Sequence, residues 1–246
     1  MKDTTKGKNT KIDELFKAGA HFGFLKSRRH PSAKRYLYGI KNNIDIYDLE
    51  KTEVELNKIL GLIETFGKEG GSIMFVGGKS EARKSVEEAG VNLSMPFVSG
   101  RWIGGTLTNF PEIKKRIAKL DELQNEKEKG ELAKYTKKER LLIDRDIAKL
   151  TMYFRGLSTM KALPKIVVVV DPKKEHIAVS EAQKMKIPVV AIAGADCNLN
   201  GVDYAIPAND ASQKSISYIM GEIVSFYKNG KEIALREQKE KEVKGE

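Results

Sequence analysis

The stretch Lys165-Ile166-Val167-Val168-Val169-Val170-Asp171-Pro172 contains the longest purely aliphatic run of the chain. An uninterrupted run of β-branched residues predicts a strand that is buried on both faces, and the Asp-Pro pair predicts its end. On both sides of this run, short apolar segments alternate with segments of helical periodicity. We therefore expect an α/β fold with a doubly wound parallel sheet, Rossmann- or flavodoxin-like, covered by helices on both faces.

The same periodicities predict the remaining elements of the chain. Further strands are predicted at 43–48, 72–76, 96–98, 187–192 and 203–206. Helices are predicted at 12–20, 49–67, 80–89, 174–185 and 211–227. Residues 21–41 resemble an irregular arm, and the mixed charges from Lys228 onward predict a frayed or disordered tail.

Residues 111–161 interrupt the alternation. The apolar side chains from Ile143 to Leu157 are spaced four, three, four and three, which is a heptad seam. Thr136 and Glu139 have the spacing of a capping box and predict where the second helix begins. We expect an inserted antiparallel helical hairpin, a coiled coil that projects from the α/β domain. Its charges nearly balance, so its faces are expected to contact solvent or a protein partner. Helices lying flat on the sheet would need a wider apolar face.

These patterns divide the chain into four parts. Residues 1–41 are predicted to form a basic N-terminal helix and RNA-binding arm, and 111–161 the hairpin. The α/β domain takes 42–110 and 162–228, and 229–246 is expected to be a charged, flexible tail.

The positive charge is concentrated at the N-terminus. The formal net charge is +10, and residues 1–41 contain eleven basic and three acidic side chains. Aromatic residues, among them Phe22 and Tyr38, are interleaved with these cations, and this combination suits phosphate contact and base stacking together. A basic block beside a nearly neutral body predicts a nucleic-acid partner. The alternative is a solubilising basic tail. The predicted phosphate contacts are Lys26, Arg28, Arg29, Lys34, Arg35 and Lys41.

A second candidate contact is Gly100-Arg101-Trp102-Ile103-Gly104-Gly105-Thr106-Leu107-Thr108-Asn109-Phe110-Pro111, which holds the only Trp. Arginine and tryptophan can stack on bases or hold phosphate. The predicted RNA contacts are Arg101, Trp102, Thr106 and Asn109, and the alternative is a core tryptophan on a tight turn. Pro111 suits a first helical turn, with Asn109 or Thr108 as its cap.

Enzyme signals are weak. Gly78-Lys79-Ser80 resembles the end of a phosphate loop, but the glycine required five residues earlier is Ile73. Lys79 and Ser80 remain secondary phosphate-contact candidates, and the alternative is a strand-to-helix turn capped by Ser80. A nucleotide-using enzyme built on Gly78, Lys79, Ser80 and Asp171 is the rival interpretation. Adjacent Glu175 and His176 diverge on a helix, which argues against an acid–base or metal site with Asp171. No catalytic residue, metal or cofactor is expected.

Composition limits the class of protein further. One cysteine, Cys197, permits neither an intramolecular disulfide nor a cysteine-cluster zinc site. The longest aliphatic run is far too short to span a membrane, and the first residues lack the apolar stretch of a signal peptide. We expect a cytoplasmic protein that is not bound to a membrane.

Several motifs together resemble the bacterial ribosomal protein S2 family, in the right order over roughly residues 12–228. They are Ala18-Gly19-Ala20-His21-Phe22-Gly23, Tyr38-Gly39 through Leu49-Glu50-Lys51-Thr52, Phe75-Val76-Gly77, Arg101 to Asn109, Leu163-Pro164, Glu175-His176-Ile177-Ala178, Ile187-Pro188-Val189 and Ile206-Pro207-Ala208-Asn209-Asp210. Arg29 stands where the family has a tryptophan, which keeps a planar surface and adds a charge, so we expect RNA contact there.

The resemblance implies a non-enzymatic structural constituent of the small ribosomal subunit. It implies binding to 16S rRNA on the solvent side, where head and body meet, and help in docking the large mRNA-capturing protein of the subunit. Neighbouring small-subunit proteins are the other expected partners, and no homo-oligomer is expected.

Overall fold

The computed structural model describes residues 8–244. Its centre is a parallel five-stranded sheet in the order β5-β4-β6-β7-β8. The strands are β4 (Ile73–Val76), β5 (Phe97–Val98), β6 (Ile166–Val170), β7 (Val189–Ala193) and β8 (Tyr204–Pro207). This confirms the predicted α/β class, and the strand order is the flavodoxin-like one.

The surroundings of β6 explain why its sequence is an uninterrupted aliphatic run. All five of its residues are buried. Ile166, Val168 and Val170 join one hydrophobic cluster, whereas Val167 and Val169 join the other. The first cluster is covered by α2 (Leu49–Lys68), α3 (Ser80–Leu93) and α7 (Gln213–Lys244), and the second by α6 (His176–Lys184) and the base of the hairpin. Burial on both faces therefore requires aliphatic residues at every position.

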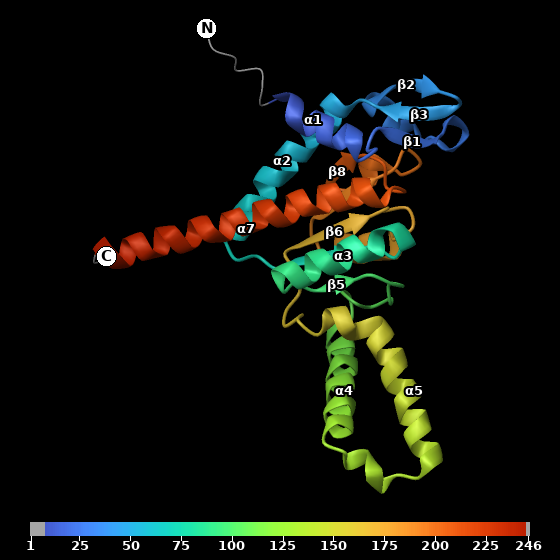
Figure 1. The fold of residues 1–246 in the computed structure, drawn as a ribbon, viewed down its shortest axis with the longest axis vertical. Helices are drawn as coiled ribbons and strands as arrows, with labels where there is room; N and C mark the ends of the chain where they lie inside the picture. Colours follow the sequence, from blue (N-terminus) through green and yellow to red (C-terminus); the bar gives the residue numbers. More distant parts are fainter. Residues whose placement is uncertain (1–7, 245–246) are drawn as a thin grey trace.

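The insertion is a helical hairpin of α4 (Phe110–Glu128) and α5 (Lys137–Phe154), which projects from the sheet domain (Figure 1). Ile113, Ile117 and Leu120 of α4 are buried together with Ile147 and Phe154 of α5. The capping box of Thr136 and Glu139 is present. Whether the pair supercoils as a coiled coil stays a prediction.

The segment expected to be an irregular arm is instead ordered. After α1 (Lys8–Lys17), the strands β1 (Phe22–Leu25), β2 (Leu37–Lys41) and β3 (Ile44–Tyr47) form an antiparallel sheet in the order β1-β3-β2. Asn42 and Asn43 both have positive φ, at 50° and 63°, which is the conformation of a two-residue hairpin turn. The boundary predicted at residue 41 falls within this small sheet, between β2 and β3.

The C-terminal prediction also needs correction, because α7 continues as one helix to Lys244. Its distal part extends away from the sheet domain (Figure 1). At the point of departure Gly230 lies directly on α2, where a Cβ atom would clash with the backbone carbonyl of Glu64. The lysine and glutamate residues beyond are good helix formers, and an ion pair joins Glu232 to Arg236 one turn later.

Short 3₁₀ segments complete the chain: η1 (Lys26–Arg28), η2 (Pro31–Tyr36), η3 (Glu131–Lys134), η4 (Arg155–Leu157) and η5 (Leu199–Gly201). Within residues 8–244, none of the helices combines the length and apolar character that crossing a membrane requires.

Candidate nucleic-acid interface

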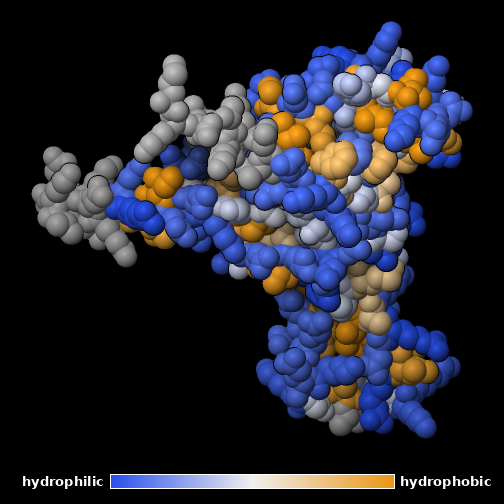
Figure 2. Space-filling model, turned by 45° about the horizontal axis from the view of Figure 1, so that its top comes forward, coloured by the Kyte–Doolittle hydropathy of each residue, from blue (hydrophilic) through white to orange (hydrophobic). Residues whose placement is uncertain are grey.

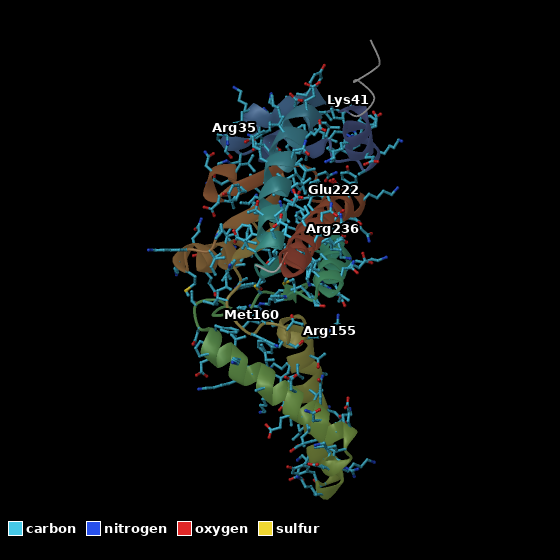
Figure 3. All side chains as sticks on the ribbon, turned by 90° about the vertical axis from the view of Figure 1, so that its left-hand side faces the viewer. Arg35, Lys41, Arg155, Met160, Glu222 and Arg236 are labelled. Atoms are coloured by element: carbon cyan, nitrogen blue, oxygen red, sulfur yellow. The ribbon has the colours of Figure 1, made fainter. Side chains whose placement is uncertain are left out.

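The small sheet, together with the 3₁₀ segments η1 and η2 between its strands, presents most of the predicted N-terminal cations to solvent. Lys26, Arg28, Lys34, Arg35 and Lys41 are all exposed. Figure 3 shows Arg35 and Lys41 at the end of the molecule opposite the hairpin. These cations come from η1, η2 and β2. The fold of residues 22–47 therefore holds them together on one ordered module.

Apolar and aromatic side chains lie among these cations. Tyr38 is 83% exposed, and Phe22 and Leu25 are about half exposed. Figure 2 shows apolar patches interleaved with hydrophilic surface at this end of the molecule. The Arg35 guanidinium lies 4.8 Å from the centre of the Tyr36 ring. Exposed rings beside unpaired cations provide stacking surface and phosphate donors together.

Arg29 does not belong to this exposed set. Its guanidinium makes a two-pronged ion pair with the carboxylate of Asp45, with Nε 2.8 Å from Oδ2. The Asp45 side chain is completely buried, on β3. A buried carboxylate requires such a partner, so Arg29 has a structural role in holding η1 against β3.

The glycine-rich stretch that contains Trp102 folds around a buried carboxylate. Trp102 is 5% exposed, and its indole Nε1 donates to Glu181 of α6 at 3.1 Å. The backbone N–H groups of Gly105 and Leu107 donate to the same carboxylate at 2.8 and 3.0 Å, and the N–H and hydroxyl of Thr108 add two further bonds. Burial alone would raise the pKa of Glu181, but these donors together lower it.

This geometry separates the RNA contacts predicted in the glycine-rich stretch into buried and exposed residues. Trp102 has almost no exposed surface for a base to stack on, and Thr106 is 1% exposed with its hydroxyl donated to the carbonyl of Ile103. Neither presents a surface to RNA in this fold, which favours the alternative of a core tryptophan on a tight turn. Arg101 and Asn109 are exposed. Asn109 occupies the N-cap position of α4 without a side-chain capping bond, whereas the Thr108 hydroxyl donates to Glu181. Pro111 lies in the first turn, as predicted.

Lys79 is committed to two carboxylates. Its Nζ lies 2.7 Å from Asp171 Oδ2 and 2.8 Å from Asp210 Oδ2. Lys79 follows β4, Asp171 follows β6 and Asp210 follows β8, so the cluster fills the sheet edge where the strand order reverses. In folds of this kind that edge is where ligands bind. Here the protein's own ion pairs occupy part of it, and Lys79 is not free for a phosphate.

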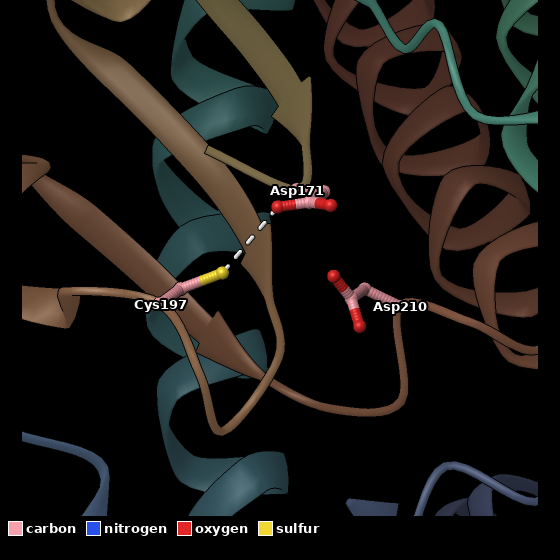
Figure 4. Close-up of side chains that lie close together, drawn as sticks. All are labelled: Asp171, Cys197 and Asp210. Carbon is pink, nitrogen blue, oxygen red and sulfur yellow. Dashed lines mark hydrogen bonds between the residues drawn. The ribbon is translucent and has the colours of Figure 1, made fainter. Parts of the chain in front are cut away.

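Asp210 is the most constrained member of the cluster. It is fully buried, and burial raises its pKa to about 6, although Lys79 opposes the shift. Cys197 lies beside it, with its thiol donating to Asp171 Oδ1 at 3.5 Å (Figure 4). Ligand atoms of Asp171, Cys197 and Asp210 lie within 4.8 Å of one another. Burial raises the pKa of the Cys197 thiol well above its ordinary value, so the thiol stays protonated beside the ion pairs.

The remaining enzyme candidates do not converge. Ser80 is not the cap of α3, because Lys79 occupies that position and the Ser80 hydroxyl donates to Glu81 at 2.8 Å. Glu175 is buried and accepts the N–H of Gly78 at 3.1 Å, whereas His176 is exposed.

Comparison with known proteins identifies the family. Residues 15–230 match the family model described as ribosomal protein S2. The chain belongs to the ribosomal protein S2 family. It is 40% identical over 220 residues to the small ribosomal subunit protein uS2 of Sulfurimonas denitrificans, covering 89% of this chain and 85% of that protein. The protein of that name from Dehalococcoides mccartyi is 42% identical over 85% of this chain and 86% of its own length. That from Nitratiruptor is 39% identical over 96% of this chain and 86% of its own length.

Membership of this family confirms the resemblance seen in the motifs. It also decides against the rival interpretation of Gly78, Lys79, Ser80 and Asp171 as an enzyme site, because the family is structural and not enzymatic. The nucleotide-using enzyme is thereby excluded as the main role of the fold.

Proposed function

We propose that this protein is a structural constituent of the small ribosomal subunit in the cytoplasm and binds 16S rRNA through the exposed cations of its small sheet. The observation that carries the proposal is the placement of Lys26, Arg28, Lys34, Arg35 and Lys41 among exposed aromatic rings on one ordered module. Arg101 and Asn109 supply a second contact. The site on the ribosome is the solvent side, where the head and body of the subunit meet.

The test is the salt dependence of binding to a 16S rRNA transcript. Each phosphate contact adds about 0.7 to 0.9 to the slope of log affinity against log salt. Changing the five cations of the small sheet to Gln should therefore weaken binding and make that slope shallower by about 3.5 to 4.5 units. The matched control changes Lys114, Lys119, Lys137, Lys138 and Arg140 of the hairpin, which are equally exposed. An unchanged slope in the small-sheet variant would contradict the proposal.

The hairpin supplies a contact of a different kind, with a protein partner, the large mRNA-capturing protein of the subunit. Leu141, Leu142 and Met152 of α5 are 52%, 51% and 69% exposed and lie outside the hydrophobic seam. Deleting the hairpin would open the core, since Ile113 and Leu157 are buried there. The sharper test changes the three exposed residues to Ser. Loss of that protein from purified subunits, with rRNA affinity retained, is expected, and retention of both would contradict the role.

A further inference from the structure

A cavity of about 370 Å³ opens beside the Lys79 cluster, at the carboxyl end of the sheet. Three cations from three separate segments line it: Arg83 of α3, Arg101 after β5, and Lys174 before α6. All three are exposed, and none forms an ion pair with a carboxylate of residues 8–244. Glu87, one turn beyond Arg83, is already paired with Arg155.

The floor of the cavity is built by close backbone contact. A Cβ atom on Gly78 would lie 2.6 Å from the carbonyl oxygen of Gly100 and 2.8 Å from Glu175 Oε1, so only glycine allows these loops to meet. Glu175 is the acidic group of the lining, and its carboxylate is buried and accepts the N–H of Gly78. Glu81 bonds the Ser80 hydroxyl and does not line the cavity. The cavity therefore carries an excess of positive charge.

We infer that this cavity binds a phosphate group, which the Arg83 and Arg101 guanidinium groups and the Lys174 ammonium hold from three sides. A guanidinium group can donate two parallel hydrogen bonds to two oxygens of a phosphate, and the lysine ammonium adds a compact positive charge. The inference rests on the proposed function, because the source of the phosphate is the backbone of the bound rRNA. It extends that function by adding Arg83 and Lys174 to Arg101 and by assigning all three to one phosphate.

The test uses the full chain with Arg83→Gln, Arg101→Gln and Lys174→Gln combined, and a 16S rRNA transcript as the probe. The matched control is Arg140→Gln, Arg145→Gln and Lys138→Gln on α5, which removes the same types and number of exposed charges. The cavity variant should lose at least tenfold in affinity at moderate salt and about 0.7 to 0.9 of salt slope, the share of one phosphate contact, whereas the control should lose much less. Circular dichroism establishes that both variants are folded.

The outcomes separate the cavity from the wider function. A cavity variant that behaves like its control, while the small-sheet variant loses affinity, overturns the phosphate site and leaves the rRNA role intact. Failure of the unchanged protein to bind the transcript overturns the rRNA role itself. Titration with inorganic phosphate and with AMP distinguishes the source. Saturable millimolar or tighter binding that the cavity variant loses, with rRNA affinity unchanged, would assign the cavity to a free phosphate ligand and overturn the rRNA source.

Discussion

The indole N–H of Trp102 donates to the carboxylate of Glu181 at 3.1 Å, and both side chains are buried. This bond joins the loop before the hairpin to α6, on the same face of the sheet. Because the loop's backbone donors converge on the same carboxylate, Glu181 fixes both the loop and the position from which Arg101 reaches solvent.

Glu181→Gln should destabilise the protein by about 2–4 kcal/mol, because an amide offers one acceptor oxygen and turns an NH₂ group toward backbone donors. Chemical denaturation measures the change. Glu122→Gln, on an exposed position of α4, is the control and should stay within about 0.5 kcal/mol of the unchanged protein. Equal stability of the two variants would show that the carboxylate does not organise the loop.

Trp102→Phe should lower the free energy of unfolding by about 1–3 kcal/mol, through the lost hydrogen bond and the smaller ring. The folded variant should bind 16S rRNA as tightly as the unchanged protein. A tryptophan stacked on a base would give the opposite pattern, with stability retained and about 1–3 kcal/mol of binding energy lost. Thermal melting and filter binding on one preparation distinguish the two.

Asp210 should make stability depend on pH in a specific direction. Its pKa is about 6 in the folded protein, against about 3.9 in an unfolded chain. Between these values the folded state binds more protons, so this group makes stability fall as pH rises from about 4 to about 6. The stability of Asp210→Asn relative to the unchanged protein should therefore increase across that interval and level off above it. A pH-independent difference would contradict the shift.

Two glycines of α7 should respond in opposite directions to the same substitution. A Cβ atom on Gly221 meets nothing within 4 Å, so Gly221→Ala should stabilise the protein by about 0.5–1 kcal/mol. A Cβ atom on Gly230 would clash with the Glu64 carbonyl of α2, so Gly230→Ala should cost about 1–3 kcal/mol. If both changes stabilise, α7 does not cross α2 as described.

The parts of the fold that the sequence predicted are those with local causes. Val167, Val168 and Val169 predict a central strand without reference to any partner, and the Thr136–Glu139 box marks its own helix start. Of the small sheet the sequence predicted only β3, as a strand at 43–48, and β1 and β2 were missed because the signal that joins β2 to β3 is Asn42-Asn43, a turn pair weaker than Asn-Gly. The α7 extension was missed because Gly230 has the appearance of a helix end until α2 is in place.

The site was harder to predict because its decisive contacts are long-range. Glu181 lies 79 positions from Trp102, and Asp210 lies 131 positions from Lys79. Charge patterning correctly found an exposed basic module, but it could not tell Arg28, which is exposed, from Arg29, whose partner Asp45 comes from the next strand but one. Cations can be counted from a sequence, whereas their exposure and their pairing depend on topology.

The most direct test of the central claim is sedimentation of the tagged full-length protein from its own cell extract, at low and at high salt. We expect migration with small ribosomal subunits at low salt and release at high salt, since phosphate contacts weaken steeply as salt rises. The variant lacking the five small-sheet cations should be released at lower salt than the hairpin control. Migration as a free, light species under both conditions would contradict the account.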